Sequence, residues 1–417
     1  MSYNDLKRVH GPAEFINQMW RHRKMVNRIC ILLAVGISLL VLTLTAGAQD
    51  EQWLQYHSER EAQQIIGGMS SSRNVTSNKP QDVKLPEFKT NQQFFIDWAT
   101  PMVKSGRLWI ALDRTSEKGQ WDRLFIDSNG NGHLDDENAV TAYRTEQRYT
   151  YFGPVKIVFE GEDGPISYHL NFRFYDYNEQ NRRLYIYSGG WYEGEVTVAG
   201  EKKYCMLIDY NVNGAFNDKS LQARDCDRIR IGKKGGRDTS FVGNYIEVDD
   251  VLYRTKIARD GAFVKLSSTE DVKYGNIRVP AAITEFAAGG ENGLFTLEIK
   301  DGTGRLPIGN YRIDHWEIDR KDERGKSWTM RGSSFSQRGD FEVTEAGETA
   351  LEIGEPVTAS IQVSLNGTNY EFSKSVRGSL GEYVRLTSSG LNIDNLWKMK
   401  AKNKEGTFEK LYPMPDQ

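Results

Sequence analysis

Short apolar runs separated by turn-forming residues constrain this chain more than any other feature. From about Phe94 onward, β-branched and aromatic segments recur, and Gly, Asp and Asn punctuate them. Leu170, Phe172 and Phe174 alternate with polar neighbours, which is typical of a half-buried antiparallel strand. We therefore predict a mainly β fold of antiparallel sheets, in which a hairpin-loop unit occurs twice and is followed by one or two β-sandwich domains.

The predicted sandwich region spans residues 275–417. It contains the stretch Leu306-Pro307-Ile308-Gly309-Asn310-Tyr311, and further strands are expected at 359–365, 370–372 and 383–386. The Leu-Pro-x-Gly-x-Tyr stretch resembles a turn and strand of immunoglobulin-like and carboxypeptidase-regulatory-like domains. The resemblance covers about ten residues and implies an immunoglobulin-like sandwich.

Residues 1–48 have the composition of an N-terminal extension plus a signal peptide. Basic residues precede an apolar run at 29–44, and Ala46-Gly47-Ala48 offers cleavage near 48/49. The run is shorter than the roughly 20 residues of a membrane-spanning helix. We expect a secreted, periplasmic or cell-surface protein. Two alternatives stay open: translation from Met25, and an uncleaved anchor that would keep the chain at a membrane.

The segment 49–90 is predicted to hold a helix and a linker. Residues 50–66 have helical propensity, with Asp50 as a cap and apolar contacts from Trp53, Leu54, Ile65 and Ile66. The next residues are rich in turn formers and indicate the linker. A β-rich domain with two acidic loops is expected at 91–274.

The acidic loop is the most informative motif, because it occurs twice. Both copies follow the pattern Ile-Asp-x-Asn-x-Asn-Gly-x-apolar-Asp/Asn-Asp, starting at Ile126 and at Ile208. A turn glycine precedes each copy (Gly119, Gly200), and an apolar-patterned segment lies between. This self-similarity indicates an internal repeat.

The residue types favour calcium as a cofactor. Calcium prefers six to eight oxygen ligands. A loop can supply them from the side chains at positions 1, 3 and 5, from the carbonyl at position 7 and from later carboxylates, if a glycine at position 6 makes the turn. The candidate metal ligands are Asp127, Asn129, Asn131, the carbonyl of His133, and Asp135 or Asp136; in the second loop they are Asp209, Asn211, Asn213, the carbonyl of Ala215, and Asn217 or Asp218.

Each loop resembles the calcium loops of EF-hand, dockerin and thrombospondin type 3 repeat proteins. Two departures limit the resemblance: Asn138 and Ser220 stand where an EF-hand has its bidentate Glu, and the flanks favour strands over helices. Few anionic ligands imply dissociation constants on the order of 10⁻⁴ to 10⁻³ M, as in extracellular modules. Such an ion would stabilise the structure.

Two features of the loops have simpler alternatives. Asn-Gly between apolar segments forms hairpin turns without a metal, since both residues tolerate positive φ. Cys205 and Cys226 bracket the second loop, and in an exported protein they form either a disulfide or two separate buried thiols.

Catalytic motifs are scarce. The chain lacks HExxH, CxxC and GxSxG patterns, and 54 basic against 57 acidic residues argue against a nucleic-acid partner. We expect a non-enzymatic binding or structural protein, with a polysaccharide or a cell-envelope component as partner. The alternative is a carbohydrate-binding protein or a carboxylate-dependent glycoside hydrolase, since two placed carboxylates suffice for that chemistry. Trp191 and Tyr192 are then the best candidates for stacking on sugar rings.

Overall fold

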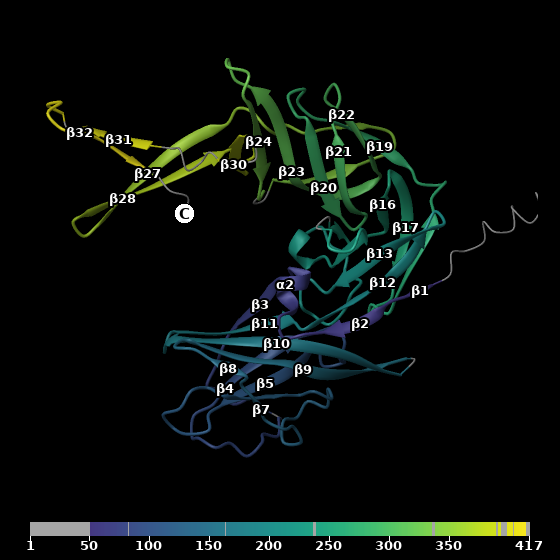
Figure 1. Ribbon diagram of the computed structural model, residues 1–417, viewed down its shortest axis with the longest axis vertical. Helices are drawn as coiled ribbons and strands as arrows, with labels where there is room; N and C mark the ends of the chain where they lie inside the picture. Colours follow the sequence, from purple (N-terminus) through teal and green to yellow (C-terminus); the bar gives the residue numbers. More distant parts are fainter. Residues whose placement is uncertain are drawn as a thin grey trace, which may run out of the picture. The chain divides into compact units, whose positions relative to one another are not determined.

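The computed structural model describes residues 51–417 except 82, 163, 237–238, 336–337, 389–390, 393–397, 403 and 414–417. The predicted signal segment, with its alternatives, lies outside these residues. The fold is mainly β, with 55% of residues in strands and 2% in helices, as the apolar pattern predicted. Nearly all neighbouring strands pair antiparallel; β19 and β26 pair parallel. Figure 1 shows the strands coloured by their position in the sequence.

The first acidic loop belongs to a four-stranded sheet. The loop begins at Asp127, directly after β6, and leads to β7, which pairs with one edge of β6. Strand β5 pairs with the other edge of β6. The sheet order is β4 (Phe94–Ala99), β5 (Arg107–Asp113), β6 (Arg123–Ile126), β7 (Val140–Thr141).

The second acidic loop has the same place in a five-stranded sheet. The loop begins at Asp209, directly after β13, and leads to β14, which pairs with one edge of β13. Strand β12 pairs with the other edge of β13. The 3₁₀ helix η1 (Ala223–Asp225) lies in this connection. The sheet order is β2 (Gln55–Ser58), β12 (Gly190–Val198), β13 (Glu201–Ile208), β14 (Arg228–Gly232), β15 (Ser240–Phe241).

Two further sheets complete the region up to residue 268. Leu170, Phe172 and Phe174 of β10 are buried as their alternation predicted. One sheet has the order β3 (Ser70–Asn74), β11 (Asn181–Ser188), β10 (Gly164–Asn178), β9 (Tyr149–Gly161), β8 (Arg144–Thr145); the other has β1 (Gln52–Trp53), β18 (Phe263–Ser268), β17 (Val251–Ile257), β16 (Tyr245–Val248).

The predicted helix at 50–66 is mostly wrong. Residues 52–53 and 55–58 form strands β1 and β2, and only α2 (Ala62–Ile66) is helical. The strands form because β2 pairs with β12 over Gln55 to Ser58, and tertiary pairing overrides a weak helix propensity. The predicted linker likewise contains β3, which pairs with β11.

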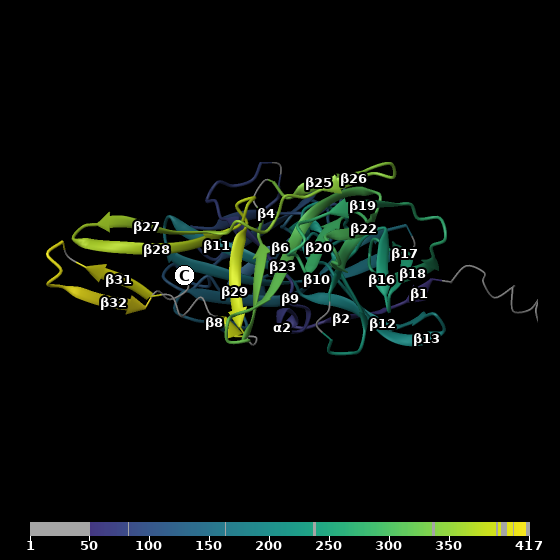
Figure 2. The same cartoon turned by 90° about the horizontal axis from the view of Figure 1, so that it is seen from above.

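The C-terminal strands build one large sheet and two small ones. The predicted strands at 359–365, 370–372 and 383–386 lie in β27, β28 and β29, and Figure 2 shows β27 and β28 side by side as a hairpin. The large sheet has the order β21 (Gly293–Glu298), β20 (Glu285–Gly290), β23 (Gly309–Lys321), β24 (Ser327–Ser333), β29 (Tyr383–Ser388), β28 (Asn369–Arg377), β27 (Thr358–Asn366), with β25 (Asp340–Val343) on β23 and β30 (Leu391–Asn392) on β29; the small sheets are β22 (Thr303–Pro307), β19 (Tyr274–Arg278), β26 (Glu348–Ala350) and β31 (Lys398–Lys402), β32 (Glu409–Pro413).

Two large apolar clusters form the core. The first draws its buried residues from positions 54 to 266 and includes Trp98 and Tyr168, whose rings stack 5.9 Å apart. The second draws its residues from positions 277 to 384 around Trp316 and Tyr311. The second acidic loop packs against the first cluster, since Val212 and Phe216 belong to it.

Candidate functional site

The first acidic loop is closed by Asp127, whose side chain is fully buried at the end of β6. Its Oδ1 accepts a hydrogen bond from the backbone N–H of Asn131 at 3.0 Å, and its Oδ2 accepts one from that of Gly132 at 2.8 Å. Burial raises the pKa of Asp127 above its ordinary value, although these N–H groups favour the charged form. The position-1 carboxylate thus shapes the turn.

Three further predicted ligands converge within this loop. The side-chain amides of Asn129 and Asn131 both donate to Oδ2 of Asp136, at 3.0 and 2.7 Å. Asn131 Oδ1 accepts from the N–H of His133 at 2.8 Å. These hydrogen bonds, led by the one from Asn129, lower the pKa of the exposed Asp136. Positions 3, 5 and 10 therefore meet at one carboxylate oxygen.

The second loop repeats this arrangement position by position. The amides of Asn211 and Asn213 donate to Oδ2 of Asp218 at 2.9 and 2.6 Å. Asn213 Oδ1 accepts from the N–H of Ala215 at 2.8 Å. Gly214 at position 6 donates to Oδ2 of Asp209 at 2.7 Å, as Gly132 does to Asp127.

Asp209 is held more firmly than Asp127. Besides Gly214, the backbone N–H groups of Val212 and Asn213 donate to its carboxylate, and the buried Tyr168 hydroxyl donates to Oδ2 at 2.7 Å. Burial raises the pKa of Asp209 to about 6, against the opposing effect of these donors. Tyr168 joins the second loop to the first apolar cluster.

Two carboxylates that the ligand pattern omitted complete the loops. Glu137 accepts from the backbone N–H and the hydroxyl of Ser128, which follows Asp127. Asp227 accepts from the backbone N–H of Tyr210, which follows Asp209, at 3.0 Å, and also from the N–H of Asp218 at 2.8 Å. Burial raises the pKa of Asp227 well above its usual range, and the charges of Asp209 and Asp218 add to this shift. Asp227 lies outside the loop motif, so no spacing rule indicated it.

The remaining predicted ligands lie apart from this convergence. Asp135 is exposed and Asn217 half-buried, and neither side chain makes these contacts among the described residues. His133 uses Nδ1 to accept from the N–H of Lys84 at 3.3 Å, while Ala215 is buried. Asn211 Oδ1 is buried without a hydrogen-bond partner in the described structure, an exception to the usual satisfaction of buried polar atoms.

The two cysteines are free thiols in the structure, which corresponds to the second of the two predicted alternatives. Both are buried. Cys226 Sγ donates to the carbonyl of Ser220 at 2.9 Å and accepts from the Ser220 N–H, so this thiol closes the end of the second loop. Burial raises the pKa of Cys205 to about 12 and that of Cys226 to about 11. Protonated thiols are poor nucleophiles.

Trp191 and Tyr192 do not form the sugar-stacking surface that the carbohydrate-binding alternative required. Trp191 and Tyr192 are only 4% and 8% exposed, because β12 is a central strand between β2 and β13. Tyr192 packs edge-on against Phe216 at 5.2 Å. Its ring therefore contributes to the core and offers no flat face to a ligand.

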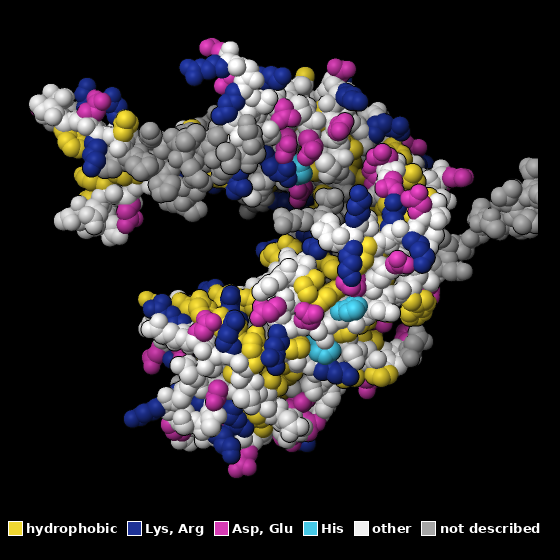
Figure 3. Space-filling view, viewed as in Figure 1, with side chains coloured by type: hydrophobic (Ala, Val, Ile, Leu, Met, Phe, Trp, Pro, Cys, Tyr) yellow, Lys and Arg dark blue, Asp and Glu magenta, His cyan; other side chains and the backbone are white. Residues whose placement is uncertain are grey.

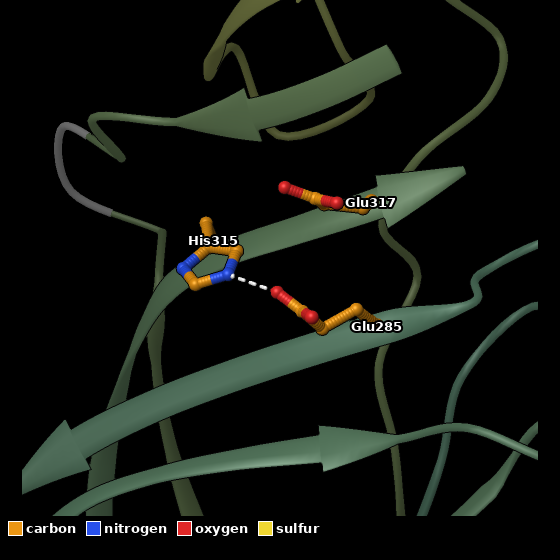
Figure 4. A group of neighbouring side chains, drawn as sticks. All are labelled: Glu285, His315 and Glu317. Atoms are coloured by element: carbon orange, nitrogen blue, oxygen red, sulfur yellow. Dashed lines mark hydrogen bonds and ion pairs between the residues drawn. The ribbon is translucent and has the colours of Figure 1, made fainter. Parts of the chain in front are cut away.

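A second group of metal-ligating side chains lies in the C-terminal sheet. Glu285, His315 and Glu317 place one ligand atom each within 4.8 Å of one another, and among the described residues they are the one group of three His, Cys, Asp or Glu that does so. Figure 4 shows them on the neighbouring strands β20 and β23. Glu285 and Glu317 are direct cross-strand partners, and His315 is two residues from Glu317, so all three share a face.

The imidazole of His315 is contacted through both nitrogens. Nε2 lies 2.8 Å from Oε1 of Glu285, and Nδ1 lies 2.9 Å from Oδ2 of Asp314. Burial disfavours the charged imidazole, but the two carboxylates outweigh it and raise the pKa of His315. Arg331 of β24 pairs with Oε1 of Glu317. Figure 3 shows acidic and basic side chains gathered around a histidine over β20 and β23.

No protein-family model matches this chain, and no curated protein or solved structure is significantly similar to it. Within the described residues, no helix is both long and apolar enough to cross a membrane. The two acidic loops and the cluster of Glu285, His315 and Glu317 are therefore the candidate sites of this chain.

Proposed function

We propose that this chain is an exported, non-enzymatic β-rich protein with a binding or structural role, whose two acidic loops are duplicated, weak structural calcium sites. The secreted, periplasmic or cell-surface location and a polysaccharide or cell-envelope partner belong to this proposal. One observation carries the calcium assignment. Positions 3, 5 and 10 converge in both loops through matching hydrogen bonds.

The convergence suits a cation because an asparagine amide can be turned over with almost no change in shape. Its oxygen and its nitrogen then exchange places. A half-turn of the Asn211 amide directs its oxygen to the place where its nitrogen now lies. Asn211 Oδ1 would then lie beside Asp218 Oδ2, while Asn213 Oδ1 keeps the hydrogen bond from Ala215. Two oxygens so close together repel one another unless a cation lies beside them.

The unsatisfied oxygen of Asn211 supports the same assignment. Its amide nitrogen donates to Asp218 and to the carbonyl of Asp225, whereas Oδ1 is buried without a partner. A buried acceptor without a donor costs about 1–3 kcal/mol. Rotation of this amide toward a bound calcium ion would remove that cost.

Calcium-dependent thermal unfolding tests the proposal. With dissociation constants on the order of 10⁻⁴ to 10⁻³ M, calcium at about 10 mM stabilises each site by roughly 1.4–2.7 kcal/mol. The double variant Asp136→Asn/Asp218→Asn removes the carboxylate at which each loop converges. It should unfold at the same temperature with calcium as with chelator.

A matched control removes two charges outside the loops. Glu162 and Glu270 are exposed, and Glu162→Gln/Glu270→Gln should retain the full calcium-dependent rise in melting temperature. An equal rise in the loop variant would assign calcium to another part of the chain. A wild-type protein that calcium does not stabilise would leave the loops as metal-free turns.

A further inference from the structure

We infer that Glu285, His315 and Glu317 form a binding site for a transition-metal ion of the zinc type, separate from the two acidic loops. One imidazole nitrogen and two carboxylates are a ligand set that suits zinc and related ions, whereas calcium takes oxygen ligands. The inference does not depend on the calcium proposal, because the two sets of residues are different.

Backbone pairing positions all three side chains. Glu285 of β20 lies opposite Glu317 of β23, and Ala287 lies opposite His315. The residues between them, Phe286 and Trp316, point the other way into the second apolar cluster and are fully buried. Sites built on strands hold their ligands more precisely than sites on loops.

A β-bulge supplies the partner that a metal-binding histidine needs. Ala287 pairs with His315 and Ala288 with Ile313, so Asp314 is the extra residue in β23. A bulge re-aims a side chain, and here the Asp314 carboxylate reaches Nδ1 of the adjacent His315 at 2.9 Å. Metal-binding histidines almost always donate their second ring N–H to a carboxylate or carbonyl in this way.

The remaining nitrogen then requires a positive charge beside it. With Nδ1 donating to Asp314, Nε2 faces Oε1 of Glu285 at 2.8 Å, with Glu317 close by. Either a proton or a metal ion must lie between Nε2 and the carboxylates. Three carboxylates surround this imidazole, whereas Arg331 is the cation paired with Glu317. Glu285 and Glu317 both place a carboxylate oxygen near this nitrogen, so an ion at this position meets one imidazole nitrogen and two carboxylates.

The distances allow an ion to enter with small side-chain rotations. Donors about 2.1 Å from a tetrahedral zinc ion lie roughly 3.4 Å apart, and the three ligand atoms here are already within 4.8 Å of one another. Arg331 occupies Oε1 of Glu317, which leaves the second oxygen of this carboxylate for the ion. Three protein ligands leave one position for water, as in catalytic rather than structural zinc sites.

Titration of the full chain with zinc alone tests the site. The protein is freed of metal with a chelator, dialysed, and titrated calorimetrically with ZnCl₂ in excess calcium chloride, so that occupied acidic loops do not contribute. We expect one zinc ion per chain, bound at least tenfold more weakly by His315→Ala and by Glu285→Gln. Cobalt(II) should show the absorption of a nitrogen- and oxygen-bound ion, which both variants lose.

The control variant is His133→Ala, which removes an imidazole in the first acidic loop and should leave zinc binding unchanged. Glu317→Gln keeps the His315 contacts with Glu285 and Asp314, so it should weaken zinc binding even if His315→Ala does not fold. Equal zinc affinity in wild type, Glu285→Gln and Glu317→Gln would overturn the inference. Zinc binding that only His133→Ala abolishes would do the same, because the ion would then lie in the loop.

Discussion

The two acidic loops share a hydrogen-bond pattern but differ in how deeply they are buried. Asn129, Asn131 and Asp136 of the first loop are exposed, whereas their counterparts Asn211, Asn213 and Asp218 are partly buried. Asp209 accepts from three backbone N–H groups and from Tyr168, while Asp127 accepts hydrogen bonds from Asn131 and Gly132. The point at which positions 3, 5 and 10 converge is therefore open to solvent in the first loop and partly covered in the second.

The two loops close their turns in the same way but make different contacts with the rest of the protein. The position-1 aspartate and the position-6 glycine close the turn in both loops. Trp98 Nε1 donates to the carbonyl of Val212 at 2.8 Å, and Phe216 packs with Tyr168 and Tyr192, so the second loop fastens strands of the first apolar cluster together. Leu134 of the first loop is buried in a smaller cluster with Phe95, Ala111 and Phe125. Equivalent substitutions should consequently have unequal effects.

Loss of the position-1 carboxylate should give the largest effect. Asp209→Ala leaves three backbone donors and the Tyr168 hydroxyl without their acceptor in a buried site, which should lower the free energy of unfolding by about 3–5 kcal/mol. Asp127→Ala removes the acceptor of the Asn131 and Gly132 N–H groups, but Asn131 is exposed and Gly132 half-buried, so water can replace part of the lost bonding and we expect about 2 kcal/mol. Guanidinium-induced unfolding in chelator measures both. Equal losses would mean that burial does not distinguish the loops.

The position-6 glycines provide a smaller contrast. Gly132 and Gly214 have φ of 84° and 93°, so alanine is strained at both positions. A Cβ on Gly132 meets nothing within 4 Å, whereas one on Gly214 comes within 3.2 Å of Met102 and Phe159. Gly132→Ala should cost about 1 kcal/mol of unfolding free energy and Gly214→Ala about 3 kcal/mol, since overpacking adds to the strain. Melting temperatures of the two variants against wild type decide this; a larger loss at Gly132 would contradict it.

The pH dependence of stability should show the smallest difference. In calcium-free buffer, burial raises the pKa of folded Asp209 to about 6, against about 4 for an ordinary aspartate. Between these values the folded chain holds a proton that the unfolded chain has released, so the free energy of unfolding falls as pH rises through this window. Asp209→Asn should flatten this slope more than Asp127→Asn, as unfolding curves between pH 4 and 7 would measure. A steeper slope in Asp209→Asn would contradict the assigned burial.

Local patterns predicted the strands and the loops because these features depend on neighbouring residues. Alternation in β10 indicated which side chains face the core, and the Asp-x-Asn-x-Asn-Gly spacing indicated side chains that converge on one point. The helix at 50–66 was wrong because β12 supplies a strand partner for 55–58, a pairing between residues far apart in the chain. The Trp191–Tyr192 platform was wrong for the same reason, since its burial depends on both neighbours of β12.

The histidine cluster shows the limit most clearly. Glu285 and His315 are thirty positions apart, and no spacing rule connects them; the β20–β23 register and the bulge at Asp314 bring them within hydrogen-bond distance. Asp227 similarly enters the second loop from the start of the next strand.

By itself, the sequence determined that this chain forms strands joined by tight turns and that two turns carry matching oxygen donors, since side-chain alternation and positive-φ residues act over a few neighbouring positions. Only the tertiary structure decided which loop is buried, which aromatic rings are covered, and which carboxylates meet His315. Burial and cross-strand contact depend on which distant strands pair, and that pairing sets the charge and solvent exposure of each group.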